Sequence, residues 1–170
     1  MKLHGNSKSA IGDCKSWWIW PTTADVGIRV FSSSKSVLFD DSIIGMQNIV
    51  FSEYIPNRYD GLVIGEIQWK HEFDRSLDRM LVRILEEVIY FSEVENKWII
   101  QSKSMISDNQ ISIVFTYVDS NVTQRDVEIK AITRHSLDAR KLTKDESIQA
   151  IEGIPEMVGP GWFASIVFDL

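Results

Sequence analysis

Residues 77–89 carry the clearest helical pattern in the chain. Apolar side chains recur every three or four residues there, and charged side chains fill the positions between them. This spacing gives a helix one apolar and one charged side, so the sequence predicts an amphipathic helix whose apolar stripe lies in a core. We expect Asp74 to cap its start. The stripe consists of Leu77, Met80, Leu81, Ile84, Leu85, Val88 and Ile89.

Other segments alternate between apolar and polar residues, which is typical of strands with one buried face. A second helix is predicted between Phe39 and Val50, after three serines that can cap it. A short helix is expected near 146–151, and the link 107–110 suits a hairpin turn. Two helices among closely linked strands predict an α+β fold, a mostly antiparallel sheet packed with two helices. The expected strands cover 26–31, 62–70, 98–106, 111–118, 127–134 and 162–168.

The length of 170 residues suits a single domain with its own core. We expect that domain to span 17–170, because no linker or repeat interrupts it. Residues 1–16 are polar and few of them are apolar, so they are expected to form a flexible N-terminal extension.

Charge and cysteine content narrow the function classes. The formal net charge of -6 argues against a chain that mainly holds nucleic acid phosphates, which requires a surplus of lysine and arginine. One cysteine, Cys14, allows no internal disulfide, and the three histidines show no zinc spacing. No apolar run is long enough to span a bilayer, and no signal peptide is recognisable. We therefore expect a cytoplasmic protein.

Three polar positions invite a chemical interpretation. Asp25 stands just before a predicted strand, Lys130 projects from the polar face of another, and Asp169 nearly ends the last one. Two carboxylates and a terminal carboxylate could together hold a hard cation such as calcium, which takes six to eight oxygen ligands. Alternatively, Asp25 is a turn acid that bonds its own backbone, while Asp169 and Lys130 are solvated surface charges. Sequence spacing alone favours this second interpretation.

Four blocks of the sequence resemble the archease family, in the family's own order. Residues Thr22-Thr23-Ala24-Asp25-Val26-Gly27 are similar to its His-Thr-Ala-Asp-Val-Gly signature, and 81–91 resembles its long amphipathic helix. Residues 130–137 (Lys-Ala-Ile-Thr-Arg-His-Ser-Leu) resemble its Lys-Ala-x-Thr-Tyr-His-x-Leu block. The closing Ile166-Val167-Phe168-Asp169-Leu170 resembles its hydrophobic-Asp-Ile or hydrophobic-Asp-Leu end. Together the blocks span nearly everything from Trp17 onward.

The resemblance implies a non-enzymatic accessory protein of tRNA splicing. Archeases assist the GTP-dependent RNA ligase that joins 3′-phosphate ends, and they promote its guanylylation and multiple turnover. The protein partner would be that ligase, RNA would be met only indirectly, and no membrane would be involved. Carried over by position, Asp25, Asp169 and Leu170 match the family's metal positions, with calcium the expected ion. Lys130 matches its functional lysine, and Arg134 and His135 lie beside it as partner-facing residues.

The sequence departs from the family pattern at three places. Thr22 replaces the signature histidine, Arg134 replaces a tyrosine, and 138–161 is longer than the usual link. We expect His135 to stabilise a turn rather than to carry chemistry. Two other functions stay open: a chaperone-like protein-interaction module without a metal-dependent role, and a metal-dependent hydrolase, for which two acids and a lysine are a thin active site.

Overall fold

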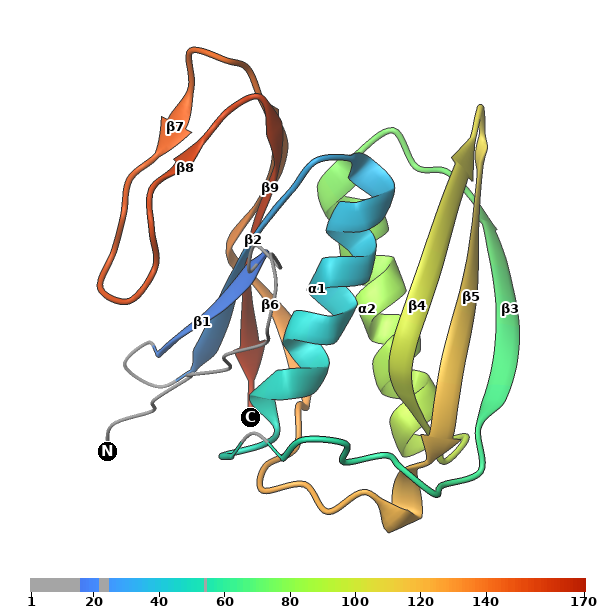
Figure 1. Ribbon diagram of the computed structural model, residues 1–170. Helices are drawn as coiled ribbons and strands as arrows, with labels where there is room; N and C mark the ends of the chain where they lie inside the picture. The colour runs from blue at the N-terminus through green and yellow to red at the C-terminus, as the bar shows by residue number, and fades with distance from the viewer. Residues whose placement is uncertain (1–15, 22–24, 54) are drawn as a thin grey trace.

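The computed structural model describes residues 16–21, 25–53 and 55–170 (Figure 1). The predicted extension 1–16 therefore lies, except for Ser16, outside the described residues, as do Thr22, Thr23 and Ala24 of the signature block. The described residues form two main antiparallel sheets with two α-helices between them. The predicted α+β class, antiparallel strands packed with two helices, is confirmed.

The first sheet, called sheet A, has the strand order β1-β2-β9-β6. Its strands are β1 (Trp17–Pro21), β2 (Val26–Ser32), β9 (Gly161–Asp169) and β6 (Ala131–Leu142). The strands β2 and β9 are its centre, and they pair antiparallel from Val26 opposite Phe168 to Ser32 opposite Trp162. The last strand of the chain thus lies beside one of the first.

The second sheet, called sheet B, has the order β3-β5-β4. Its strands are β3 (Gly65–Glu72), β4 (Lys97–Ser107) and β5 (Gln110–Asp119). The predicted hairpin is confirmed, because β4 and β5 pair from Ser107 opposite Gln110 onward. A short 3-10 helix, η1 (Ser120–Val122), follows β5.

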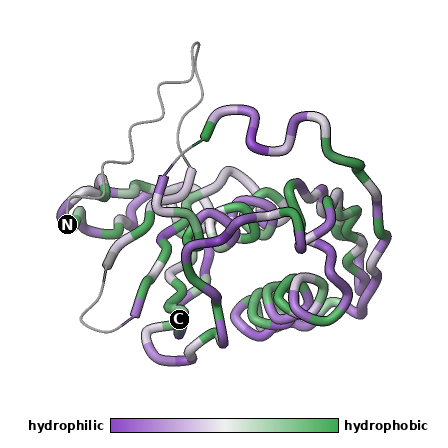
Figure 2. The backbone as a smooth tube through the Cα atoms, turned by 90° about the horizontal axis from the view of Figure 1, so that it is seen from below, coloured by the Kyte–Doolittle hydropathy of each residue, from purple (hydrophilic) through white to green (hydrophobic). Residues whose placement is uncertain are grey.

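The helices α1 (Lys35–Ile49) and α2 (Leu77–Glu93) fill the space between the sheets. Figure 2, which looks nearly along the helix axes, shows both hydrophobic and hydrophilic residues on the helices. The helix α2 has the buried apolar stripe that is typical of an amphipathic helix. Ser34 caps α1 as predicted, and its hydroxyl accepts from the Val37 amide. The prediction for α2 was wrong: Ser76 is its cap, while Asp74 accepts from the Ser76 amide at 2.8 Å.

One hydrophobic core joins the helices to the inner faces of both sheets. The apolar stripe of α2 is largely buried in it, as predicted, and so are Ile28 and Ile166 of sheet A. The core also takes Ile111, Ile113 and Phe115 from the central strand of sheet B. The layers are therefore held by one continuous apolar contact rather than by two separate cores.

Two sequence predictions near the C-terminus were wrong. The predicted strand 127–134 begins only at Ala131 and continues to Leu142 as β6. No helix forms near 146–151; instead β7 (Ser147–Ile148) pairs with β8 (Met157–Val158) in a small hairpin. This segment is polar and contains Pro and Gly, a composition that does not indicate strands, so its two short strands were not predicted. No helix in the described part of the chain is long and apolar enough to cross a membrane.

Candidate metal and partner site

The antiparallel register of β2 and β9 brings Asp25 and Asp169 to the same end of sheet A. The pairing reaches Val26 opposite Phe168; Asp25 is the residue just before β2, and Asp169 is the last residue of β9. Two residues separated by most of the chain are therefore brought to one sheet end, which sequence spacing alone could not show. Asp169 is exposed, and Asp25 is partly buried.

Lys130 joins the same end of the sheet from the adjacent strand. Ala131 pairs with Asp169, and the Lys130 amide donates to the main-chain oxygen of Asp169 at 2.9 Å. Its ammonium donates to the main-chain oxygen of Leu170 at 2.6 Å. The expectation that Lys130 lies within a strand was wrong, because it precedes β6. Its proximity to the last two residues still follows from the pairing.

The groups gathered here fit a hard cation by their chemistry. Every donor is an oxygen: the two carboxylates of Asp25 and Asp169 and the main-chain oxygens of the last residues. Among the described residues, no group of three or more acidic, histidine or cysteine side chains could hold a metal. Water would therefore have to complete the coordination shell. The Lys130 ammonium already contacts the Leu170 oxygen, so a divalent cation would compete with it there.

An open pocket adjoins this sheet end, and sequence reasoning missed it. Besides Lys130 and Leu170, its lining comes from the segment between η1 and β6. Arg125 is held there by Glu93 at 2.6 Å, and Asp126 accepts two hydrogen bonds from Ser52. These bonds to Ser52 lower the pKa of the Asp126 carboxyl, first through the main-chain amide. The sequence predicted a strand over 127–134 and gave no sign of the contacts that Arg125 and Asp126 make. The remaining lining residues are Thr123, Val127 and Glu128.

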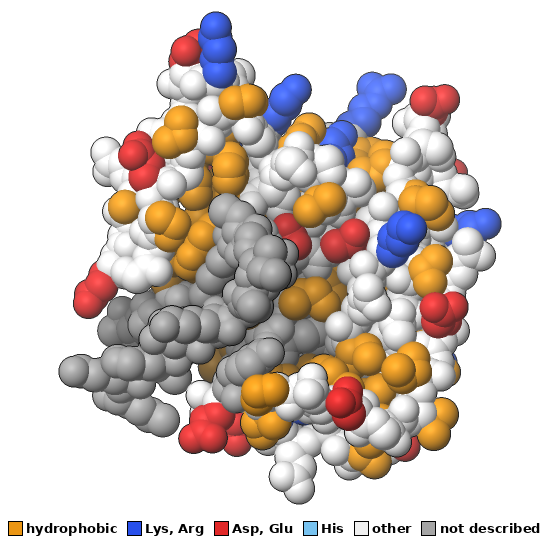
Figure 3. Space-filling view, in the orientation of Figure 1, with side chains coloured by type: hydrophobic (Ala, Val, Ile, Leu, Met, Phe, Trp, Pro, Cys, Tyr) orange, Lys and Arg blue, Asp and Glu red, His pale blue; other side chains and the backbone are white. Residues whose placement is uncertain are grey.

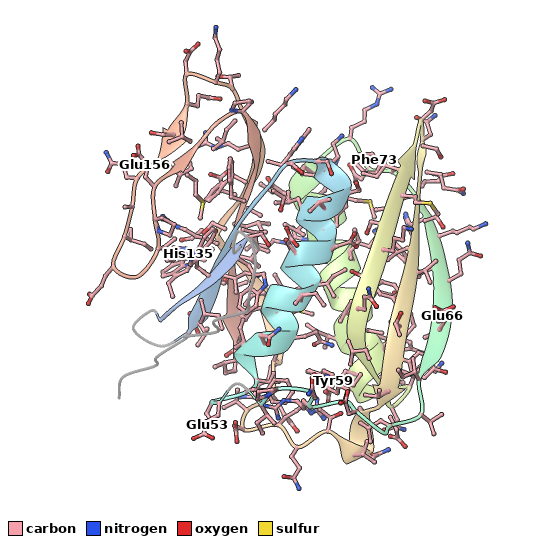
Figure 4. All side chains as sticks on the ribbon, in the orientation of Figure 1. Glu53, Tyr59, Glu66, Phe73, His135 and Glu156 are labelled. Carbon is pink, nitrogen blue, oxygen red and sulfur yellow. The ribbon has the colours of Figure 1, made fainter. Side chains whose placement is uncertain are left out.

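Arg134 and His135 lie on a bulge of β6. The register passes from Thr133 opposite Val167 to Asp138 opposite Ser165, so four residues of β6 stand against one of β9. Within the bulge, Ser136 has a φ of 60°, which is uncommon for a residue with a side chain. Both predicted partner-facing residues are exposed. Figure 4 places His135 on the side of sheet A away from the helices.

Comparison with known proteins identifies the family. The sequence matches the Archease protein family (MTH1598/TM1083) over residues 17–170. A solution structure of Methanobacterium thermoautotrophicum protein 1598 is 16% identical, with a TM-score of 0.57, covering 92% of this chain and all of that one. A crystal structure of an archease from Thermotoga maritima, described as a possible chaperone, is 16% identical, with a TM-score of 0.53, covering 98% of this chain and all of that one.

No curated protein matches the sequence. At 16% identity the two solved structures show a shared fold and no more. The family match covers both carboxylates, Lys130 and the β6 bulge. Because that match extends over most of the chain, this protein belongs to the archease family.

Proposed function

We propose that this protein is an accessory factor of the GTP-dependent RNA ligase that joins 3′-phosphate ends in tRNA splicing. It would promote guanylylation of the ligase and let each ligase molecule complete several turnovers, without being an enzyme itself. Family membership supports the proposal. The observation that carries it is the end of sheet A, where the pairing of β2 with β9 brings Asp25 and Asp169 to the same end and Lys130 bonds both terminal residues.

In this proposal a divalent cation, calcium by preference, binds Asp25, Asp169 and the main-chain oxygen of Leu170. The cation would neutralise two carboxylates and order the last residues of β9. Lys130, Arg134 and His135 would face the ligase, because all three are exposed on or beside β6. The overall negative charge fits a factor that binds the ligase and leaves the RNA to it.

A ligation assay tests this function. The cognate ligase is supplied in substoichiometric amounts with RNA ends and GTP, and ligated product per ligase molecule is counted with and without this protein. We expect several turnovers with the wild-type chain and about one without it. Asp25→Asn and Asp169→Asn should lose the gain, because each removes one of the two charged ligands.

Asp108→Asn is the matched control, since Asp108 is an exposed aspartate in the β4–β5 turn of sheet B, far along the chain from the site. It should activate like the wild type. Circular dichroism of each variant shows that it is folded. Full activation by both folded site variants would refute the metal-dependent function.

A second candidate is a chaperone-like interaction module that needs no metal. The Thermotoga maritima relative is described as a possible chaperone. In addition, Ile55, Val63 and Ile64 expose 51%, 89% and 57% of their surface in the segment before β3. Figure 3 shows hydrophobic side chains along the lower edge of the molecule, where this segment runs in Figure 1. Exposed apolar groups of this kind suit binding of an unfolded client.

An assay of how well this protein suppresses the aggregation of an unfolded client protein separates the chaperone-like function from the ligase-accessory function. A Val63→Ser/Ile64→Ser variant should lose suppression if the chaperone function holds, while Asp169→Asn should keep it. If the ligase-accessory function holds, Asp169→Asn should lose activation in the ligation assay, while Val63→Ser/Ile64→Ser should keep it.

A further inference from the structure

The outer face of sheet A, the side away from the helices, is covered by the segment 143–160. This segment contains β7 and β8 and lies over the sheet in Figure 1. A second, smaller hydrophobic cluster fastens it there, which takes polar groups beneath it out of water. The cluster consists of Leu142, Ile154, Met157 and Phe163, with Trp18, Trp20, Phe31 and Ile148 packed against it.

Two hydrogen-bond donors on this face have no acceptor among the residues that the structure describes. Nε of Arg29 and Nε1 of Trp20 are both buried without a partner. They belong to the same part of the face: a Cβ built on Gly27 would lie 2.7 Å from Trp20 Nε1, so the indole N–H lies over Gly27. Arg29 is two residues further along β2, and its side chain emerges on the same side. A buried donor without an acceptor costs about 1–3 kcal/mol, so two neighbouring ones call for an explanation.

The Arg29 guanidinium also has no counter-charge within the described ranges. Its Nη1 donates to the main-chain oxygen of Gln149 in the covering segment at 3.2 Å. Among the described residues, no carboxylate lies within ion-pair distance of it. Burial lowers the pKa of Arg29. The acid nearest in register is Asp138, two strands away, and it pairs with Arg140 at 3.3 Å.

Ser165 adds a third polar group at this place. It stands opposite Arg29 on β9 and is 8% exposed. Its hydroxyl can donate or accept, whereas the guanidinium and the indole N–H only donate. A water molecule would accept from these donors but bring two hydrogens of its own. An oxyanion brings acceptors alone together with the missing negative charge, so it matches the site better.

We propose that Arg29, Trp20 and Ser165 bind an oxyanion of the phosphate type beneath the segment 143–160. The ligand is inorganic phosphate or the phosphate group of a nucleotide. Because both orphan donor atoms are covered, the segment must move aside for entry. The site is separate from the proposed cation site, since Arg29 is four residues along β2 from Asp25, about 13 Å.

Thermal unfolding of the full chain tests this proposal. Sodium phosphate is compared with sodium chloride at equal ionic strength and pH 7, and AMP is the nucleotide probe. A ligand that binds only the folded state raises Tm by about 3 °C at a tenfold excess over its Kd. We expect this rise for the wild type and its loss in Arg29→Gln. Trp20→Phe, which keeps a ring but removes the N–H, should reduce the rise.

Arg140→Gln is the control, because it removes an arginine from the same sheet that already has a carboxylate partner. It should keep the full rise. A wild-type chain that phosphate does not stabilise, or an equal rise in Arg29→Gln, would overturn the proposal. If Arg29→Gln does not fold, Trp20→Phe decides in the same way. Stabilisation by AMP as well as by phosphate identifies a nucleotide site, and stabilisation by phosphate alone identifies a free-anion site.

Discussion

The two faces of β2 and β9 use the same strands for different purposes. The inner face presents Ile28, Val30, Ile166 and Phe168, each fully buried against the helices. The outer face presents Gly27, Arg29 and Ser165. On this face the buried N–H groups of Arg29 Nε and Trp20 Nε1 have no acceptor among the described residues. The inner face therefore stabilises the fold, whereas the outer face and the end of the strands hold polar groups whose arrangement the fold does not require. Substitutions on the two faces should separate stability from binding.

The largest effect is expected on the inner face. Ile166→Ala removes a side chain with no exposed surface from the centre of sheet A and leaves a cavity. The free energy of unfolding should fall by about 3 kcal/mol, measured by urea titration. Val158→Ala, at a side chain 55% exposed on β8, should change it by less than about 0.5 kcal/mol. Equal losses at the two positions would contradict the claim that burial on the inner face of sheet A stabilises the fold.

On the outer face, Gly27→Ala should cost about 1–3 kcal/mol through overpacking. The new methyl group would lie 2.5 Å from Cε2 of Trp20, so the indole would have to move. Trp20→Phe removes the atoms that clash, and the double variant should therefore lose less than the sum of the two single losses. Additive losses would show that the indole does not lie over Gly27.

At the strand end, Lys130→Met should raise calcium affinity about fivefold, because it removes a positive charge that contacts the Leu170 oxygen. The same variant should activate the ligase less well if Lys130 faces the partner. Calcium titration and the ligation assay read these two effects separately. A fall in calcium affinity would mean that the ammonium positions the oxygen for the cation instead of competing with it.

The smallest expected effect on stability concerns the carboxyl of Asp41, which lies in α1. Burial raises the pKa of Asp41, although hydrogen bonds from Ser32 and Ser16 oppose it. The folded state thus holds this proton more tightly than the unfolded state, and stability should decrease as pH rises from the ordinary aspartate pKa through the raised one. Asp41→Asn should remove this decrease, measured as Tm against pH. An unchanged profile would assign the effect to other groups.

The sequence predicted the fold class because its patterns are local. The stripe of α2 and the alternation in β4 and β5 follow from burial of one face, and each was found where expected. It did not predict that the strands divide between two sheets, because strand pairing depends on contacts far apart in the chain. The β7–β8 hairpin was missed for a related reason, since each of its strands has only two residues.

The candidate site was predicted in part. Asp25, Asp169 and Lys130 were singled out by residue chemistry and then by resemblance, and the strand pairing brings them to one sheet end. Their metal binding and partner contacts stay predictions. Arg29 and Trp20 gave no signal, because an arginine in an alternating strand is typical of a solvated face. Only the covering segment reveals that their donors are buried.

Calcium titration by calorimetry tests most directly whether Asp25 and Asp169 form one cation site. The wild-type chain should bind one calcium ion per molecule. Asp25→Asn and Asp169→Asn should each lose binding, and the double variant should lose little more, because both carboxylates hold the same ion. Asp108→Asn should bind like the wild type. Calcium binding that survives unchanged in both single variants would contradict the account.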